Sequence, residues 1–134
     1  IFRNAELFVA ATNLEQLGLK TDEDAMRVYP PIFTALADYI GNAAEAYDVY
    51  IAMARPKQET RVIMAQSMLN ALLNVKNMAA VFFENRVDNE LSKGLVGSVK
   101  GTSFETYPEA RGNLKDQLQS FKAAVRAVQS PQAD

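Results

Sequence analysis

Residues 107–129 read YPEARGNLKDQLQSFKAAVRAVQ, and this stretch carries the clearest helical periodicity in the chain. Its apolar side chains recur at steps of three and four residues, at Tyr107, Ala110, Leu114, Leu118, Phe121, Val125 and Val128. Steps of this size place all of them on the same side of an α-helix. The stretch therefore predicts a last helix over residues 107–129 with one buried side, followed by a frayed tail over residues 130–134.

The same steps recur in three earlier segments of the chain. They predict helices over residues 2–17, 31–54 and 58–88. Gly41 lies inside the second of these helices, where it is expected to let a neighbouring helix approach closely. The third helix would be roughly 45 Å long, so we expect more than one other helix to cover it.

Prolines mark two of the boundaries. Residues 21–29 begin with the sequence TDED, whose hydroxyl and acidic side chains are typical of a helix start. Because Pro30 disfavours helical backbone at the residue before it, this segment is predicted to be a short helical turn that ends at Tyr29. Pro56 then predicts a sharp corner between the two long helices.

Residues 89–106 interrupt the pattern. They contain Gly94, Gly97 and Gly101 and show no apolar periodicity, so they predict a long loop. Two short connections and one long connection between four predicted helices indicate an all-α, up-down-up-down four-helix bundle. The length of 134 residues suits one domain with one core, so residues 1–134 are expected to form a single bundle.

The composition removes several classes of chemistry. The chain has no Cys, and it has neither His nor Trp, although 49% of its residues are hydrophobic. Without His, the usual acid–base catalysis at neutral pH and the known di-iron bundle sites are excluded. The formal net charge of −2 gives nucleic-acid binding no overall electrostatic support. We therefore expect a protein that is not an enzyme, with no cofactor, no metal and no small-molecule substrate.

Three residue groups invite a ligand-binding interpretation, but packing or helix capping explains each of them better. The methionines of the longest predicted helix resemble soft-metal ligands, although filling the core is the commoner role of Met. The acidic residues of the second segment lack the ligand spacing of a calcium loop and suit a helix start. The tyrosines are expected at the edge of the core, with hydroxyls that reach water. The members of the three groups are Met64, Met68 and Met78; Asp22, Glu23 and Asp24; and Tyr39, Tyr47 and Tyr50.

A row of basic residues on the last predicted helix is the most specific candidate for a binding surface. This basic strip consists of Arg111, Lys115, Lys122 and Arg126. At 100° per residue the four positions fall within about 60° of the helix circumference, beside the apolar stripe. The strip is either an ordinary solvated helix face or a docking surface for an acidic partner protein. Arg55, Lys57 and Arg61 form a second, looser basic group at the end of the predicted bundle.

Several short sequences occur in an order known from one family of helical bundles. They are DY at 38–39, YD at 47–48, ARPKQE at 54–59, LLNVKNMAA at 72–80, YPEA at 107–110 and NLKDQL at 113–118. Spread over roughly 100 residues, this pattern resembles the PsbQ family, extrinsic subunits of photosystem II in the thylakoid lumen. The chain differs from the basic plant members in its charge and in its longer loop over residues 89–106, as a divergent algal member would.

The resemblance implies a location and a role. It implies a peripheral membrane protein of the chloroplast thylakoid lumen, with the photosystem II core and other extrinsic subunits as partners. Such a subunit binds the lumenal face and supports ion retention at the oxygen-evolving centre without performing the chemistry. Three alternatives stay open: a PsbQ-like lumenal subunit of the chloroplast NADH dehydrogenase-like complex, a self-assembling filament or coat subunit, and an enzyme that uses only carboxylates and Lys.

Overall fold

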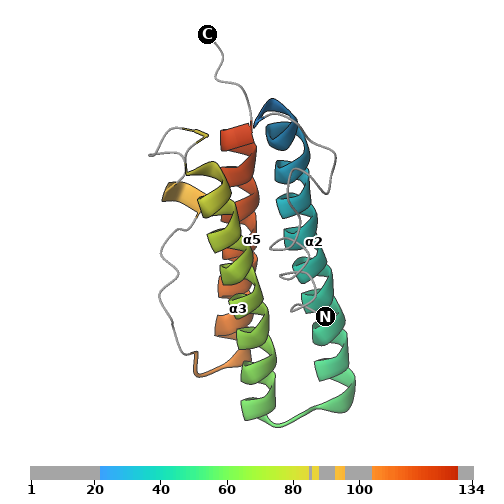
Figure 1. The fold of residues 1–134 in the computed structure, drawn as a ribbon. Helices are drawn as coiled ribbons and strands as arrows, with labels where there is room; N and C mark the ends of the chain where they lie inside the picture. Colours follow the sequence, from blue (N-terminus) through green and yellow to red (C-terminus); the bar gives the residue numbers. More distant parts are fainter. Residues whose placement is uncertain (1–21, 85, 88–92, 96–103, 130–134) are drawn as a thin grey trace.

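The computed structural model describes residues 22–84, 86–87, 93–95 and 104–129, and these residues form an all-α bundle (Figure 1). Its three long helices are α2 (Asp22–Ala54), α3 (Gln58–Phe83) and α5 (Tyr107–Gln129). Each of them packs against the other two. The predicted all-α bundle is thereby confirmed, whereas the predicted helix 2–17 and tail 130–134 lie outside the described residues.

Helix α2 runs unbroken through both of its prolines. The prediction of a turn that ends at Tyr29, followed by a helix from residue 31, is therefore wrong. Proline removes a backbone hydrogen bond and normally breaks a helix interior. Here the segment before Pro30 is held by packing, because Tyr29 is buried and its ring centroid lies 4.7 Å from that of Phe82 on α3. This tertiary contact outweighs the local preference.

The corner between α2 and α3 is made by residues 55–57. Arg55 adopts a left-handed conformation, with a φ of 49°, and its N–H donates to the Ile51 carbonyl at 3.0 Å. A left-handed residue after the last helical turn is a common helix ending, although Gly is its usual occupant. The predicted break at Pro56 is confirmed, and it brings α3 back alongside α2.

Helix α3 ends at Phe83 rather than at residue 88. The guanidinium of Arg86 donates to the Phe82 carbonyl at 2.6 Å and lies 4.5 Å from the centre of the Phe82 ring. The chain thus supplies a side-chain donor to one of the carbonyls that a helix end leaves without a partner. The apolar periodicity alone does not reveal that α3 ends at Phe83.

Helix α5 begins and ends where the sequence predicts. Thr106 provides its N-terminal cap, since its hydroxyl oxygen accepts the Glu109 N–H at 3.4 Å and its carbonyl accepts the Ala110 N–H at 3.2 Å. The spacing of Thr and Glu matches that of a capping box. Local sequence therefore fixes this helix start.

The three helices do not alternate in direction. Helix α2 runs antiparallel to α3, but α3 and α5 run the same way (Figure 1). Two contacts show the shared direction, because Gln58 bonds to Glu105 beside the start of α5 and Lys76 bonds to Gln117 further along both helices. The up-down-up-down order is wrong at this point. Residues 84–106 join opposite ends of the bundle, and about 20 extended residues easily exceed the helix length of roughly 35 Å.

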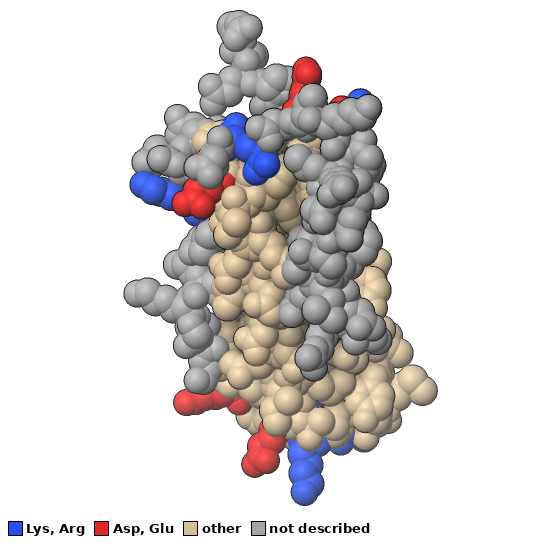
Figure 2. All heavy atoms as spheres, in the orientation of Figure 1, with Lys and Arg blue, Asp and Glu red and all other residues tan. Residues whose placement is uncertain are grey.

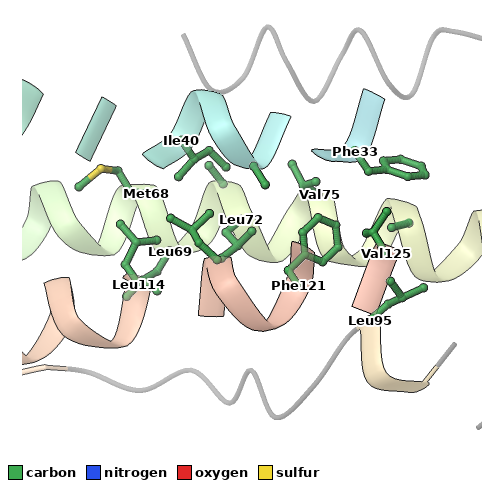
Figure 3. Close-up of a cluster of buried hydrophobic side chains, with 14 of the residues drawn as sticks. Phe33, Ile40, Met68, Leu69, Leu72, Val75, Leu95, Leu114, Phe121 and Val125 are labelled. Atoms are coloured by element: carbon green, nitrogen blue, oxygen red, sulfur yellow. The ribbon is translucent and has the colours of Figure 1, made fainter. Parts of the chain in front are cut away.

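The core lies between the three helices and is almost entirely apolar (Figure 3). Its largest side chains with under 2% exposure include Phe33, Phe83, Phe121, Met68, Leu72 and Leu114. Leu118 lies against Gly41, where an added Cβ would sit 3.7 Å from its Cδ1 atom, an ordinary contact distance. The prediction that Gly41 lets a neighbouring helix approach closely is therefore not supported, because an added Cβ atom would fit at this position.

The segment predicted as a long loop also contributes to the core. Most of residues 89–106 lie outside the described part of the chain. Within the described part, residues 93–95 form a helical turn, and Leu95 is completely buried beside the α5 residues of the core. The glycine-rich composition of residues 89–106 gives no indication that Leu95 is buried.

Candidate functional site

The basic strip lies along the edge of α5 that borders α2. On a helical projection, Arg111 and Lys122 fall next to the buried stripe, while Lys115 and Arg126 fall about 20–60° farther from it. The structure follows this order. The side chains of Arg111 and Lys122 reach across to α2, whereas Lys115 and Arg126 are exposed.

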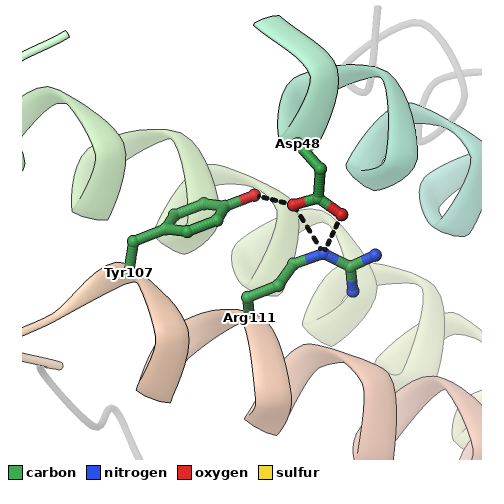
Figure 4. A network of polar contacts seen from close by, with 3 residues as sticks. All are labelled: Asp48, Tyr107 and Arg111. Carbon is green, nitrogen blue, oxygen red and sulfur yellow. Dashed lines mark hydrogen bonds and ion pairs between the residues drawn. The ribbon is translucent and has the colours of Figure 1, made fainter. Parts of the chain in front are cut away.

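Arg111 belongs to a three-residue cluster around Asp48 (Figure 4). Its Nε atom lies 3.1 Å from both carboxylate oxygens of Asp48. The Tyr107 hydroxyl also donates to this carboxylate. Burial, and then the hydrogen bond and charge of Asp48, raise the pKa of Tyr107 well above its ordinary value of 10.0. The cluster fastens the first turns of α5 to the last turns of α2.

A second ion pair lies farther along the same helix boundary. The Lys122 Nζ atom is 2.5 Å from the Asp38 carboxylate, and the two side chains are 36% and 51% exposed. Arg111 and Asp48 are less accessible, at 21% and 42%. Both contacts join α2 to α5, so half of the predicted basic strip takes part in the bundle's own packing.

The remaining predicted binding residues lie on the surface. Lys115 and Arg126 are exposed on α5, and Arg55 and Lys57 are exposed at the α2–α3 corner. The hydrogen bond from the Gln58 side chain to the Glu105 carbonyl, at 2.8 Å, ties that corner to the beginning of α5. Arg55 and Lys57 therefore lie at the same end of the bundle as the start of the strip.

The sequence interpretation missed the acidic partners on α2. Asp38, Glu45 and Asp48 follow one another at steps of seven and three, and the register of the two ion pairs places the turn with Glu45 across from the turn with Lys115. A comparison of charge between predicted helices could have found these partners. The predicted helix over residues 31–54 holds three acidic residues and no basic residue, whereas the one over residues 107–129 holds two acidic and four basic residues.

A buried lysine is the second feature that the sequence interpretation missed. Lys76 on α3 is only 3% exposed, and its Nζ atom donates to the Gln117 side-chain oxygen at 3.2 Å. Burial lowers the pKa of Lys76 below its ordinary value of 10.5. A lowered pKa suits an amine for proton transfer, although only 3% of the Lys76 surface is exposed.

The structure shows where two of the three groups set aside from the sequence lie, the methionines and the tyrosines. Met68 is fully buried in the core and Met78 packs against it, which confirms core filling for these two. Tyr47 packs at the edge of the core, whereas Tyr39 is 43% exposed and Tyr50 is 48% exposed.

Two further findings concern only the residues that the structure describes. None of their Asp and Glu residues form a group of three or more that could hold a metal ion. None of their helices combines the length and apolar character of a membrane span.

Comparison with protein-family models, with curated proteins and with solved structures gives no match to this chain. The features of the surface that bear on function are therefore the two ion pairs between α2 and α5 and the exposed basic residues of the strip and of the α2–α3 corner.

Proposed function

We propose that this protein is a non-enzymatic subunit that docks on the lumenal face of photosystem II, beside other extrinsic subunits, and shields the oxygen-evolving centre. The choice of partner rests on the resemblance to the PsbQ family. The choice of mechanism rests on the surface of α5 and of the α2–α3 corner. The site of action would be the chloroplast thylakoid lumen, peripheral to the membrane.

The observation that carries the mechanism is the division of the basic strip. Arg111 and Lys122 are held by Asp48 and Asp38, so the inner half of the strip is matched within the bundle. Lys115 is exposed on the outer half. Charges on an interface rim mainly steer association and set its salt dependence. Lys115, Arg126 and the corner cations would therefore guide an acidic partner surface onto this side of the bundle.

The test is binding to thylakoid membranes stripped of their extrinsic proteins. The double variant Lys115→Glu/Arg126→Glu is expected to lower the affinity at least tenfold at low salt. The loss should shrink as salt rises, because salt screens exposed charges. Arg111 and Lys122 are unsuitable for charge reversal, since their loss would also leave Asp48 and Asp38 unmatched.

The control variant is Arg27→Glu/Lys93→Glu, which changes the net charge equally at exposed positions outside the strip and corner. It also removes the ion pair of Arg27 with Asp24, at 3.1 Å within one turn of α2, but exposed pairs of this kind contribute little to stability. It should bind like the unaltered protein. Equal binding by the strip variant would exclude the strip as the interface. Isolation of the protein with the NADH dehydrogenase-like complex instead of photosystem II would overturn the choice of partner.

A further inference from the structure

The outer face of α3 has no charged side chain along most of its length. Between Val62 and Phe83 the only charged residue is Lys76, which is buried. Figure 2, in the orientation of Figure 1, shows the result as an uncharged band over α3, and the coloured charged side chains visible on this face lie toward its two ends. An exposed helix face is ordinarily polar and charged, so this band requires an explanation.

The outward positions of this face follow a regular pattern. Steps of four and three connect Ile63, Ser67, Asn70, Asn74, Asn77 and Val81, which we name the α3 seam. The two apolar residues at its ends are largely accessible, Ile63 at 64% and Val81 at 69%. Ser67, Asn70 and Asn77 are exposed as well, and Asn74 is half-buried. The Ser67 hydroxyl donates to the Ile63 carbonyl at 2.9 Å, so towards a partner it can act as an acceptor. Alternating steps of three and four are the spacing at which two helices pack along a shared line.

The seam is complementary to itself when it is reversed. If a second copy runs antiparallel and the two-fold axis passes near Leu72, Ile63 of each copy meets Val81 of the other. Ser67 then meets Asn77, and Asn70 meets the turn that carries Asn74. Apolar residues face apolar residues, and amides face amides or a hydroxyl. Within α3 itself, no exposed charged side chain between Val62 and Phe83 opposes the approach.

From this pattern we infer that the α3 seam is a self-association surface whose occupant is the α3 seam of a second copy of this chain. A two-fold interface uses the same surface on both partners, so self-complementarity is the property it requires. The amide side chains fit a lipid surface poorly, and the lack of cations gives nucleic acid no attraction.

The expected association is weak. Ile63 and Val81 are 18 residues apart, which corresponds to roughly 27 Å along the helix. One pair of helix faces of this length would bury no more than about 1,200 Å² in total, the lower limit of standard interfaces. The dimer should therefore form at micromolar or higher concentrations. This inference is independent of the proposed docking function, because the seam lies on α3 and the basic strip lies on α5.

The first test is sedimentation equilibrium of the protein over a concentration range from about 1 μM to 1 mM. The variants Ile63→Lys and Val81→Lys should each weaken dimerisation at least tenfold. The control is Met53→Lys, which adds the same charge at an 81% exposed apolar residue of α2 and should leave dimerisation unchanged. Circular dichroism of each variant checks the helical fold. A monomer at the highest concentration, or seam variants that dimerise normally, would overturn the inference.

The second test measures the direction of the two helices. Because the chain has no Cys, a single substitution such as Ser67→Cys or Asn70→Cys allows one spin label per protomer. In an antiparallel pair centred near Leu72, the distance between identical labels should grow by about 3 Å for every residue away from the centre. Residue 63 would then give a much longer distance than residue 70. Equal distances at all positions would indicate a parallel pair and contradict the proposed symmetry.

Discussion

Lys76 places an amino group where the other buried side chains of the described residues are apolar. Its hydrogen bond to Gln117 joins α3 to α5 across the core boundary. A buried charge costs free energy through lost hydration. Burial lowers the pKa of Lys76, which indicates that its contacts do not fully offset this cost. We therefore expect Lys76 to lower the free energy of unfolding of the bundle.

Replacing Lys76 with Met should raise the free energy of unfolding at pH 7 by about 1 kcal/mol, because Met has a similar length and no charge to dehydrate. The gain should depend on pH. The folded-state pKa of Lys76 lies below the ordinary value of 10.5, so between the two values the unfolded chain binds more protons. The destabilisation that the buried ammonium group causes in the unaltered protein is thus complete below the lowered pKa and disappears as the pH rises toward 10.5.

Urea unfolding of both proteins at a series of pH values measures this difference directly, since other titrating groups affect both proteins alike. Lys57→Met is the matched control at an exposed lysine and should change stability little. A Lys76→Met protein that is less stable at neutral pH would show that the contacts of the ammonium group outweigh its dehydration.

Gly41 offers a simpler prediction at the residue scale. Its position inside α2 costs helix stability, and an added methyl group would make only an ordinary contact with Leu118. The Gly41→Ala variant should therefore be more stable by about 1 kcal/mol, the usual difference between these residues in a helix interior. Thermal unfolding tests this, with Gly112→Ala, where nothing lies near the added Cβ atom, as a comparison. A loss of stability at position 41 would show that α2 and α5 need the close approach.

At the scale of the elements, α2 and α5 are matched by charge along their shared boundary. The cluster of Asp48, Tyr107 and Arg111 is less exposed than the Asp38–Lys122 pair. Hydrogen bonds to a carboxylate are stronger than neutral ones, and exposure to water weakens ion pairs. The two contacts should therefore differ in strength although both join the same helices.

Double-mutant cycles can measure this difference. Asp48→Asn combined with Tyr107→Phe should give a coupling free energy of about 1 kcal/mol. The cycle of Asp38→Asn with Lys122→Met should give less than about 0.5 kcal/mol. The folded-state pKa of Tyr107 is raised, so its contribution should be complete below pH 10.0 and be lost as the pH rises above it. Equal coupling in both cycles would contradict this order.

The helix ends show how far sequence alone can predict the elements. Helix α5 could be placed correctly because its apolar stripe is a local feature. The Thr106 cap, which the prediction did not use, is local as well. The continuation of α2 past Pro30 could not be predicted, because it depends on a contact between Tyr29 and Phe82, which are far apart in the chain. The basic strip was visible as a pattern, but its division depended on which helix lies beside α5.

At the scale of the molecule, the connections differ in length. Helices α2 and α3 are joined by residues 55–57 and form a hairpin, whereas α5 joins the bundle only after residues 84–106. Sequence indicated this long connection but not the direction of the helix that follows it. Short connections favour antiparallel neighbours, while a connection of this length permits either direction.

This arrangement predicts the order of folding, because contacts close in sequence cost less chain entropy to form. The α2–α3 hairpin should be largely formed in the transition state, with α5 docking afterwards. Phe33→Leu, at the contact of α2 with Phe83, should mainly slow folding. Val125→Ala, in the buried stripe of α5, should mainly speed unfolding. Denaturant-dependent folding kinetics would reveal the reverse order if α5 takes part in the nucleus.

The uninterrupted passage of α2 through Pro30 and Pro31 has a consequence for local motion. Neither proline carries an amide hydrogen, so the carbonyls of Met26 and Arg27 cannot receive their usual helical bonds. The first two turns of α2 are consequently joined to the rest of the helix by side-chain packing more than by backbone bonds. They can open as a separate unit, and their amides should exchange with solvent deuterium sooner than those that follow Pro31.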